Sequence, residues 1–129
     1  MESSLATTPP PSTSSLDQPG NREALALWHK VLLESVKAGS FDLSARQVTL
    51  TLTVYLEAGP HTVRSLAAQL GISKPAVCRA IDTLSKHGLV ARKEDKQDRR
   101  NVFIERTETG RTYLTQFSES ILNHLMEIA

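Results

Sequence analysis

The sequence is poor in cysteine, aromatic residues and long apolar runs, and each scarcity excludes a class of protein. Cys78 is its one cysteine, which excludes an internal disulfide framework. Its four histidines fall in no C-x-x-C or H-E-x-x-H spacing, so we expect no metal site and no cofactor. Three Phe, two Tyr and one Trp are too few for a module that stacks single-stranded bases. Without an apolar run of about 18 residues or a signal peptide, we expect a cytoplasmic chain with no membrane partner.

Catalysis is not expected either. The histidines stand on separate predicted elements, and neither a G-x-S-x-G sequence nor a Gly-rich phosphate loop occurs. No paired carboxylates stand out in a segment that would form a pocket. We therefore expect a binding protein and not an enzyme.

Positive charge is concentrated in one part of the chain. Residues 62–107 hold ten Lys or Arg against five Asp or Glu, although the net charge of the whole chain is only +1. Such segregation is typical of a protein with a polyanionic partner, and a solvated surface of mixed charge is the alternative. The local motifs decide between the two.

The start of the chain differs in composition from the rest. Residues 1–20 are rich in Ser, Thr, Pro and Gly and hold few apolar side chains, which predicts a disordered tail. Residues 21–129 are enough for one domain with one core.

The two ends of that domain predict helices with apolar stripes, over residues 21–39 and 109–128. The stripe over residues 21–39 is too broad for one partner, so we expect it to meet the core on one side and a second subunit on the other. Burial within a monomer is the alternative. Leu25, Trp28 and Leu32 belong to the first stripe, and Phe117, Ile121 and Leu125 belong to the second.

The segment 44–58 fits two interpretations. Its leucines and valines alternate with threonines at the two-residue period of a strand. Against this, Ser44 and Gln47 form a capping box, and Gly59 with Pro60 provides a helix stop. We therefore predict a helix.

Two short helices and a hairpin follow. Thr62 and Ser73 can each cap a helix, and Gly71 between them permits the positive φ of a tight turn, which predicts a helix-turn-helix over 62–87. Beyond it, β-prone residues on both sides of a polar run predict a two-stranded hairpin over 89–106. The expected fold is therefore mainly α with a small β-hairpin wing, a winged helix-turn-helix.

The second helix of this motif has one apolar and one polar face. Val77, Ala80, Ile81 and Leu84 form the face expected in the core. The opposite face can enter a DNA groove, where Arg79 is long enough to read guanine edges or to contact the backbone. The residues of this helix expected to contact DNA are Ser73, Lys74, Pro75, Ala76, Cys78, Arg79 and Thr83, and the same face carries Asp82 and Lys86.

The chain resembles the MarR family of bacterial transcriptional regulators over residues 21 to about 128. The resemblance rests on TVRSLAAQLGISKPAVCRAIDTLSKHGLV (62–90) and DRRNVFIERTETG (98–110). In that family the wing carries a D-x-R motif, matched here by Asp98 and Arg100 with Arg99 between them. The resemblance implies that Arg100 enters the minor groove of DNA and that Asp98 helps to hold the loop.

The resemblance also implies partners. MarR-like proteins form homodimers through their first and last helices, although this chain has only about 20 residues after the wing. The apolar stripes suit that role, and the dimer contacts implied are Leu25, Trp28, Leu32, Phe117, Ile121 and Leu125. Many members bind a small-molecule effector between the dimer helices and the DNA-binding lobe, but no cluster of residues here identifies one. The function implied is a sequence-specific regulator of transcription at a pseudo-palindromic operator in double-stranded DNA, most simply a repressor at the nucleoid.

Two alternatives remain at this point. A winged helix used as a protein-interaction module would keep the core pattern, but it would not need the positive face. Cys78 stands where the family often has Ser or Thr, so a small contact near the DNA backbone is its expected role. A redox switch would require a lowered thiol pKa.

Overall fold

The computed structural model describes residues 15–128, so residues 1–14 of the predicted disordered tail lie outside it. Within that predicted tail, Ser15–Asp17 form a short 3-10 helix. The chain divides into a central unit, Ser40–Phe117, and a terminal unit, made of the residues up to Gly39 and from Ser118 onward. In the described residues no helix is both long and apolar enough to cross a bilayer.

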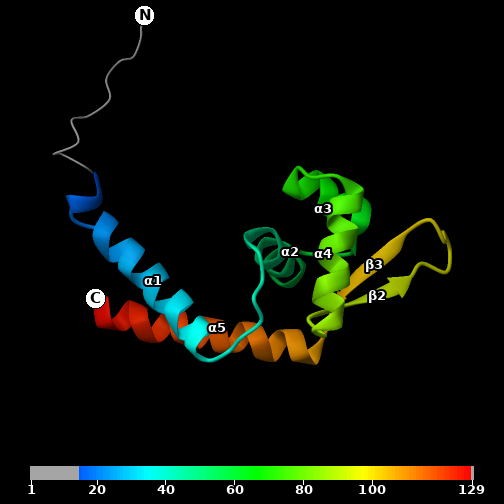
Figure 1. Ribbon diagram of the computed structural model, residues 1–129. Helices are drawn as coiled ribbons and strands as arrows, with labels where there is room; N and C mark the ends of the chain where they lie inside the picture. Colours follow the sequence, from blue (N-terminus) through cyan, green and yellow to red (C-terminus); the bar gives the residue numbers. More distant parts are fainter. Residues whose placement is uncertain (1–14, 129) are drawn as a thin grey trace, which may run out of the picture. The chain divides into compact units, whose positions relative to one another are not determined.

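The order of the elements is that of a winged helix-turn-helix (Figure 1). The elements after the 3-10 helix are α1 (Asn21–Lys37), α2 (Ala45–Leu56), β1 (His61–Thr62), α3 (Val63–Leu70), α4 (Lys74–Lys86), β2 (Val90–Glu94), β3 (Val102–Arg106) and α5 (Glu108–Ile128).

Residues 45–56 form a helix, α2, as the capping box predicted, and not the strand that the alternation of threonines also fits. The Ser44 hydroxyl accepts a bond from the Gln47 N–H (3.1 Å), and the Gln47 side chain accepts one from the Ser44 N–H (2.9 Å). The threonines that suggested a strand donate their hydroxyls to carbonyls one turn back, at 2.8 Å for Thr49, Thr51 and Thr53. These local bonds satisfy the threonine hydroxyls within the helix, including that of Thr51, which is buried beside Leu50 and Val54.

The turn between α3 and α4 forms as its sequence predicts. The Thr62 hydroxyl accepts from the Ser65 N–H (3.0 Å), and the Ser73 hydroxyl accepts from the Ala76 N–H (3.2 Å). Gly71 ends α3 at φ 68°, a left-handed conformation that a Cβ would strain. Both caps and the glycine thus fix the direction in which α4 leaves the turn.

The sheet has three strands and not the predicted two. β1 pairs antiparallel with β3 through His61 and Ile104, and β3 pairs with β2, in the order β1-β3-β2. A two-residue strand is too short to show a period, which is why the sequence pattern did not predict it. The added strand joins the middle of β3 to the start of α3.

The central unit encloses one apolar core. Leu50 and Val54 of α2, Leu66 of α3 and Ile81 and Leu84 of α4 are fully buried. Burial of this kind contributes about 1.5–3 kcal/mol for each large apolar side chain. The predicted core face of α4 is confirmed, since Val77 and Ala80 are buried with it.

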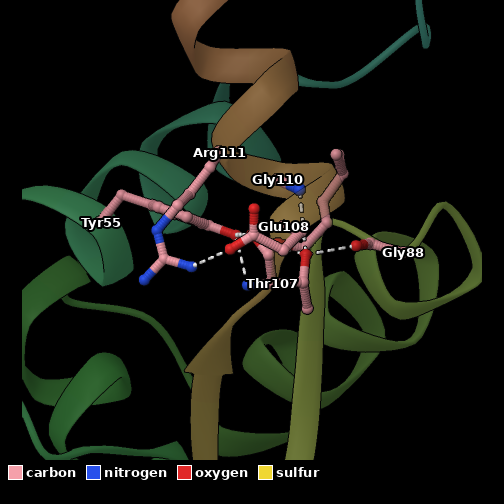
Figure 2. A network of polar contacts seen from close by, with 7 residues as sticks. Tyr55, Gly88, Thr107, Glu108, Gly110 and Arg111 are labelled. Carbon is pink, nitrogen blue, oxygen red and sulfur yellow. Dashed lines mark hydrogen bonds and ion pairs between the residues drawn. The ribbon is translucent and has the colours of Figure 1, made fainter.

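A polar network joins α2, the turn between α4 and β2, and the start of α5 (Figure 2). The Tyr55 hydroxyl donates to the Leu89 carbonyl (2.7 Å) and accepts from the Thr107 N–H (2.8 Å). The Thr107 hydroxyl donates to the Gly88 carbonyl (2.6 Å) and accepts from the Gly110 N–H (2.9 Å), so it caps α5. A Cβ on Gly110 would collide with the Tyr55 hydroxyl oxygen and stand 2.5 Å from the Leu89 carbonyl oxygen. The network therefore requires glycine at this position.

In the terminal unit, α1 and the last turns of α5 are linked by charged side chains. His124 Nδ1 lies 2.8 Å from Glu127 Oε1, and His124 Nε2 lies 3.4 Å from Glu34 Oε2. Lys30 Nζ lies 3.6 Å from the same Glu127 carboxylate. The cluster therefore joins two helices that are far apart in the sequence.

Candidate nucleic-acid interface

The outward face of α4 presents most of the residues that the sequence predicted for it. Ser73, Lys74, Pro75, Cys78 and Arg79 are exposed. Thr83 is half-buried, and its hydroxyl donates to the Arg79 carbonyl at 3.4 Å. This face therefore begins at the N-terminus of α4 and continues for two turns of the helix.

Ala76 differs from the prediction. Its side chain is only 6% exposed, although it was expected to face DNA. At about 100° per residue, Ala76 stands roughly 60° from Arg79 on the side of Ala80, where the helix turns toward the core. A small side chain is accommodated at this boundary, so Ala76 offers no side-chain surface to a ligand.

The N-terminal part of α4 is electropositive. The first-turn amides of a helix carry partial positive charge, and the Ser73 hydroxyl already occupies one of them at Ala76. Among the described residues no ion pair involves Lys74, Arg79 or Lys86. These three cations are therefore available to a polyanion.

The wing tip is organised by the residues of its D-x-R sequence. Asp98 Oδ1 accepts from the Arg100 backbone N–H (3.1 Å) and from Arg100 Nε (3.0 Å), while Oδ2 accepts from Nη2 (3.2 Å). The Arg100 side chain and then its backbone N–H hold the pKa of the Asp98 carboxyl below its usual value. The Arg100 side chain stays 90% exposed, and Arg99 beside it is exposed too. The carboxylate thus orients a guanidinium that remains open to solvent.

Sequence reasoning missed one residue of this surface, Arg92 of β2. Its Nη2 donates to the carboxylate of Asp82 and, at 3.4 Å, to the carbonyl oxygen of Cys78, both on α4. No local sequence pattern predicts this pair, because Asp82 and Arg92 are ten residues apart and lie on a helix and a strand. The one signal in the sequence was the predicted position of Asp82 on the outward, cationic face of α4, because an acid there is expected to pair with a basic residue.

The apolar stripes predicted for the dimer are largely uncovered in the single chain. Trp28 is 63% exposed, and Leu25, Leu32, Ile121 and Leu125 are between 42% and 46% exposed. Further exposed apolar side chains of the terminal unit are Leu16, Leu33, Val36, Leu122 and Met126. Isolated apolar residues on a surface are ordinary, but a stripe of them on two helices indicates a surface that becomes covered.

Phe117 differs from the other residues predicted for the dimer. It is half-buried and belongs to the central unit, where its ring meets Tyr113 edge to face at 5.3 Å between centroids. Tyr113 is in turn tilted against Phe41, which stacks on His87 at 4.2 Å. Phe117 therefore packs in an aromatic cluster within the chain. The apolar residues of α5 thus fall into two groups: Phe117 packs inside the central unit, and Ile121 and Leu125 are exposed in the terminal unit.

The model of the MarR family matches residues 45–102. These residues are therefore similar to the MarR family, and we call them the MarR segment. It includes α2, the helix-turn-helix, the wing strand β2 and the wing tip, and with them every residue predicted to contact DNA. The predicted dimer stripes lie outside the MarR segment.

Similar proteins carry this fold. An uncharacterized HTH-type transcriptional regulator of Bacillus subtilis, YcgE, is 33% identical over 78 residues, which are 60% of this chain and 47% of that protein. The chain therefore spans about half the length of that relative. CouR from Rhodococcus jostii, solved with p-coumaroyl-CoA, is 26% identical with a TM-score of 0.57 over 80% of this chain and 70% of its own. MepR of S. aureus, solved with DNA, shares the fold with a TM-score of 0.67 at 22% identity, over 81% and 83%.

Proposed function

We propose that this chain is a homodimeric regulator of transcription that binds double-stranded DNA with sequence specificity. The observation that carries the proposal is the surface of the MarR segment. There Lys74, Arg79 and Lys86 of α4 have no acidic partner among residues 15–128, and Asp98 orients an exposed Arg100 at the wing tip. MepR, which shares the fold, has been solved with DNA.

Each part of this surface suits one groove. An α-helix fits the major groove, where Arg79 can donate two bonds to a guanine edge, while Ser73 and Lys74 at the helix N-terminus suit phosphate. The wing suits the minor groove, because a narrow A/T-rich groove has a strong negative potential that attracts a guanidinium such as that of Arg100. Arg99 and the small side chain of Cys78 would then lie beside the backbone.

The dimer is proposed from the uncovered stripes of the terminal unit. A second copy would cover Trp28, Leu25 and Leu125 with the same apolar patch of its own surface, as a two-fold axis requires. Two copies of α4 would then address half-sites about one helical turn apart, roughly 10 base pairs, in a pseudo-palindrome. Occupation of such a site at a promoter blocks the polymerase, so repression at the nucleoid is the simplest outcome.

A small-molecule effector is proposed as a further partner. Its support is indirect: CouR, which is similar in fold and 26% identical, has been solved with p-coumaroyl-CoA. An effector would act by favouring one of two dimer conformations that differ in affinity for DNA.

The test compares Arg79 with an arginine outside the surface. Arg79→Ala should weaken binding to a duplex enriched from a randomised library by about 1–3 kcal/mol and relax preference at one base position. Arg111→Ala removes the same charge from an arginine that is paired with Glu108 on α5, and it should leave DNA affinity unchanged. Wild-type affinity should fall steeply with salt concentration, because phosphate contacts release counterions.

The wing is tested separately from the helix. Arg100→Ala should barely move the melting temperature, because an exposed ion pair contributes at most about 1 kcal/mol, but it should weaken binding severalfold on A/T-rich flanks. Unchanged affinity of folded Arg79→Ala and Arg100→Ala proteins would favour a protein-interaction module instead.

A further inference from the structure

Asp82 is an acid on the face of α4 that carries the free cations. It follows Arg79 by three residues and precedes Lys86 by four, so all three lie on one side of the helix. Its side chain is 61% exposed. A carboxylate in this position would repel phosphate, and at these spacings it could also pair with either cation and withdraw it from DNA.

The structure pairs Asp82 with neither cation of its own helix. Arg92 of β2 donates from Nη2 to the Asp82 carboxylate, and the same nitrogen bonds the Cys78 carbonyl oxygen at 3.4 Å. In the described part of the chain, Arg79 and Lys86 take part in no ion pair. Arg92 therefore pairs with the one acid on this face of α4, and Arg79 and Lys86 stay unpaired within the described residues.

The next residue of the strand provides an internal comparison. Successive side chains of a strand alternate between its faces, and Lys93 pairs with Glu105 of β3 at 3.8 Å. The two cations of β2 thus differ in partner: Lys93 pairs with an acid of β3, and Arg92 pairs with an acid of α4.

We propose that Arg92 is a positioning residue that sets DNA affinity by neutralising Asp82, and that it does so without contacting phosphate itself. The inference rests on the proposed function, in which α4 enters the major groove. Without Arg92, the carboxylate faces the phosphates uncompensated and captures Arg79 or Lys86. With Arg92, the charge of α4 that meets DNA is that of its cations alone.

A double-mutant cycle tests the pair. Wild type, Arg92→Gln, Asp82→Asn and the double variant are titrated by fluorescence anisotropy against a labelled duplex of roughly 30 base pairs that the wild type has enriched from a randomised library. Arg92→Gln should weaken binding by about tenfold or more, since it exposes an acid to phosphate. Asp82→Asn should bind at least as tightly as wild type. The double variant should bind within about threefold of Asp82→Asn, because Arg92 has no acid left to neutralise.

Lys93→Gln is the matched control, since it removes the same charge from the same strand. Its effect on affinity should be equal whether position 82 holds the wild-type residue or the Asp82→Asn substitution. Melting temperatures confirm that each variant is folded, and the exposed ion pair should shift them only slightly.

Three results would overturn the inference. An equal loss from Arg92→Gln with and without Asp82→Asn would make Arg92 a direct phosphate contact, and unchanged affinity of Arg92→Gln would remove it from the interface. Weaker DNA binding by the single variant Asp82→Asn, in which Arg92 is unchanged, would show that the Asp82 carboxylate itself contributes to binding. Failure of the wild type to enrich any duplex would instead contradict the proposed function.

Discussion

In the central unit Leu50, Val54 and Leu66 are fully buried, whereas in the terminal unit Trp28 and Met126 are 63% and 77% exposed. Val31 is the one apolar side chain among the described residues of the terminal unit that is buried to a similar degree, at 6% exposure. Both units are built from helices with clear apolar stripes. The periodicity of apolar residues in a helix therefore predicts that one face of the helix is buried. It does not predict whether the chain itself or a second molecule buries that face.

The largest effect should come from the core of the central unit. Leu66→Ala removes a fully buried side chain and should lower the free energy of unfolding by about 2–5 kcal/mol. Leu56→Ala is the matched control, because that leucine is 74% exposed, and it should cost less than about 0.5 kcal/mol. Denaturant unfolding measures both. Equal costs would contradict the placement of Leu66 in the core of the central unit and of Leu56 on its surface.

The next effect concerns assembly. Trp28→Glu places a charge in the uncovered stripe and should weaken the dimer by about 2 kcal/mol or more, since aromatic side chains at interfaces often dominate binding. Sedimentation equilibrium gives the dissociation constant of the dimer. Leu56→Glu introduces the same charge at an exposed leucine of the central unit and should leave the dimer intact. A dimer that tolerates Trp28→Glu would place the interface elsewhere.

Gly110→Ala tests the polar network at the start of α5. The new Cβ has no room beside the Tyr55 hydroxyl and the Leu89 carbonyl, so the variant should lose about 1–3 kcal/mol of stability. The loss should be smaller when Tyr55→Phe has already removed the hydroxyl, because part of the collision is then absent. Thermal unfolding of the two single variants and the double variant measures this coupling. Additive losses would contradict the crowded geometry.

The smallest effect is a pH dependence of the terminal unit. The hydrogen bond to Glu127, followed by the negative charges of Glu127 and Glu34, raises the pKa of His124 above its ordinary value against an opposing effect of desolvation. A raised pKa in the folded state means that the stabilisation is complete below about pH 6.5 and is lost as the pH rises through the folded-state value. The difference in melting temperature between wild type and His124→Gln should shrink over that interval. A difference that stays constant with pH would contradict this assignment.

Local signals in the sequence predicted much of the fold. The caps at Ser44, Thr62 and Ser73 and the turn at Gly71 depend on residues three or four positions apart, so a short stretch of sequence holds all the information they need. For the same reason α2 could be recognised as a helix despite its strand-like alternation.

The features that the sequence did not predict depend on distant residues. β1 exists because β3 supplies its partner, and the ion pair of Asp82 with Arg92 forms because a strand passes beside a helix. Ala76 was misplaced because a helical wheel gives the angle of a residue but not the edge of the core. Phe117 was predicted at the dimer because it continues the apolar stripe of α5. Its ring packs instead on Tyr113, whose further partner Phe41 is remote in the sequence.

The central claim is that the central unit binds DNA while the terminal unit pairs two copies of the chain. The mass of the complex with one enriched duplex, measured by light scattering, tests both halves at once. The account predicts two protomers on one duplex with half-sites roughly 10 base pairs apart, and separation of the protomers by Trp28→Glu with much weaker binding. One wild-type protomer per duplex at saturation, or no complex at low salt, would contradict it.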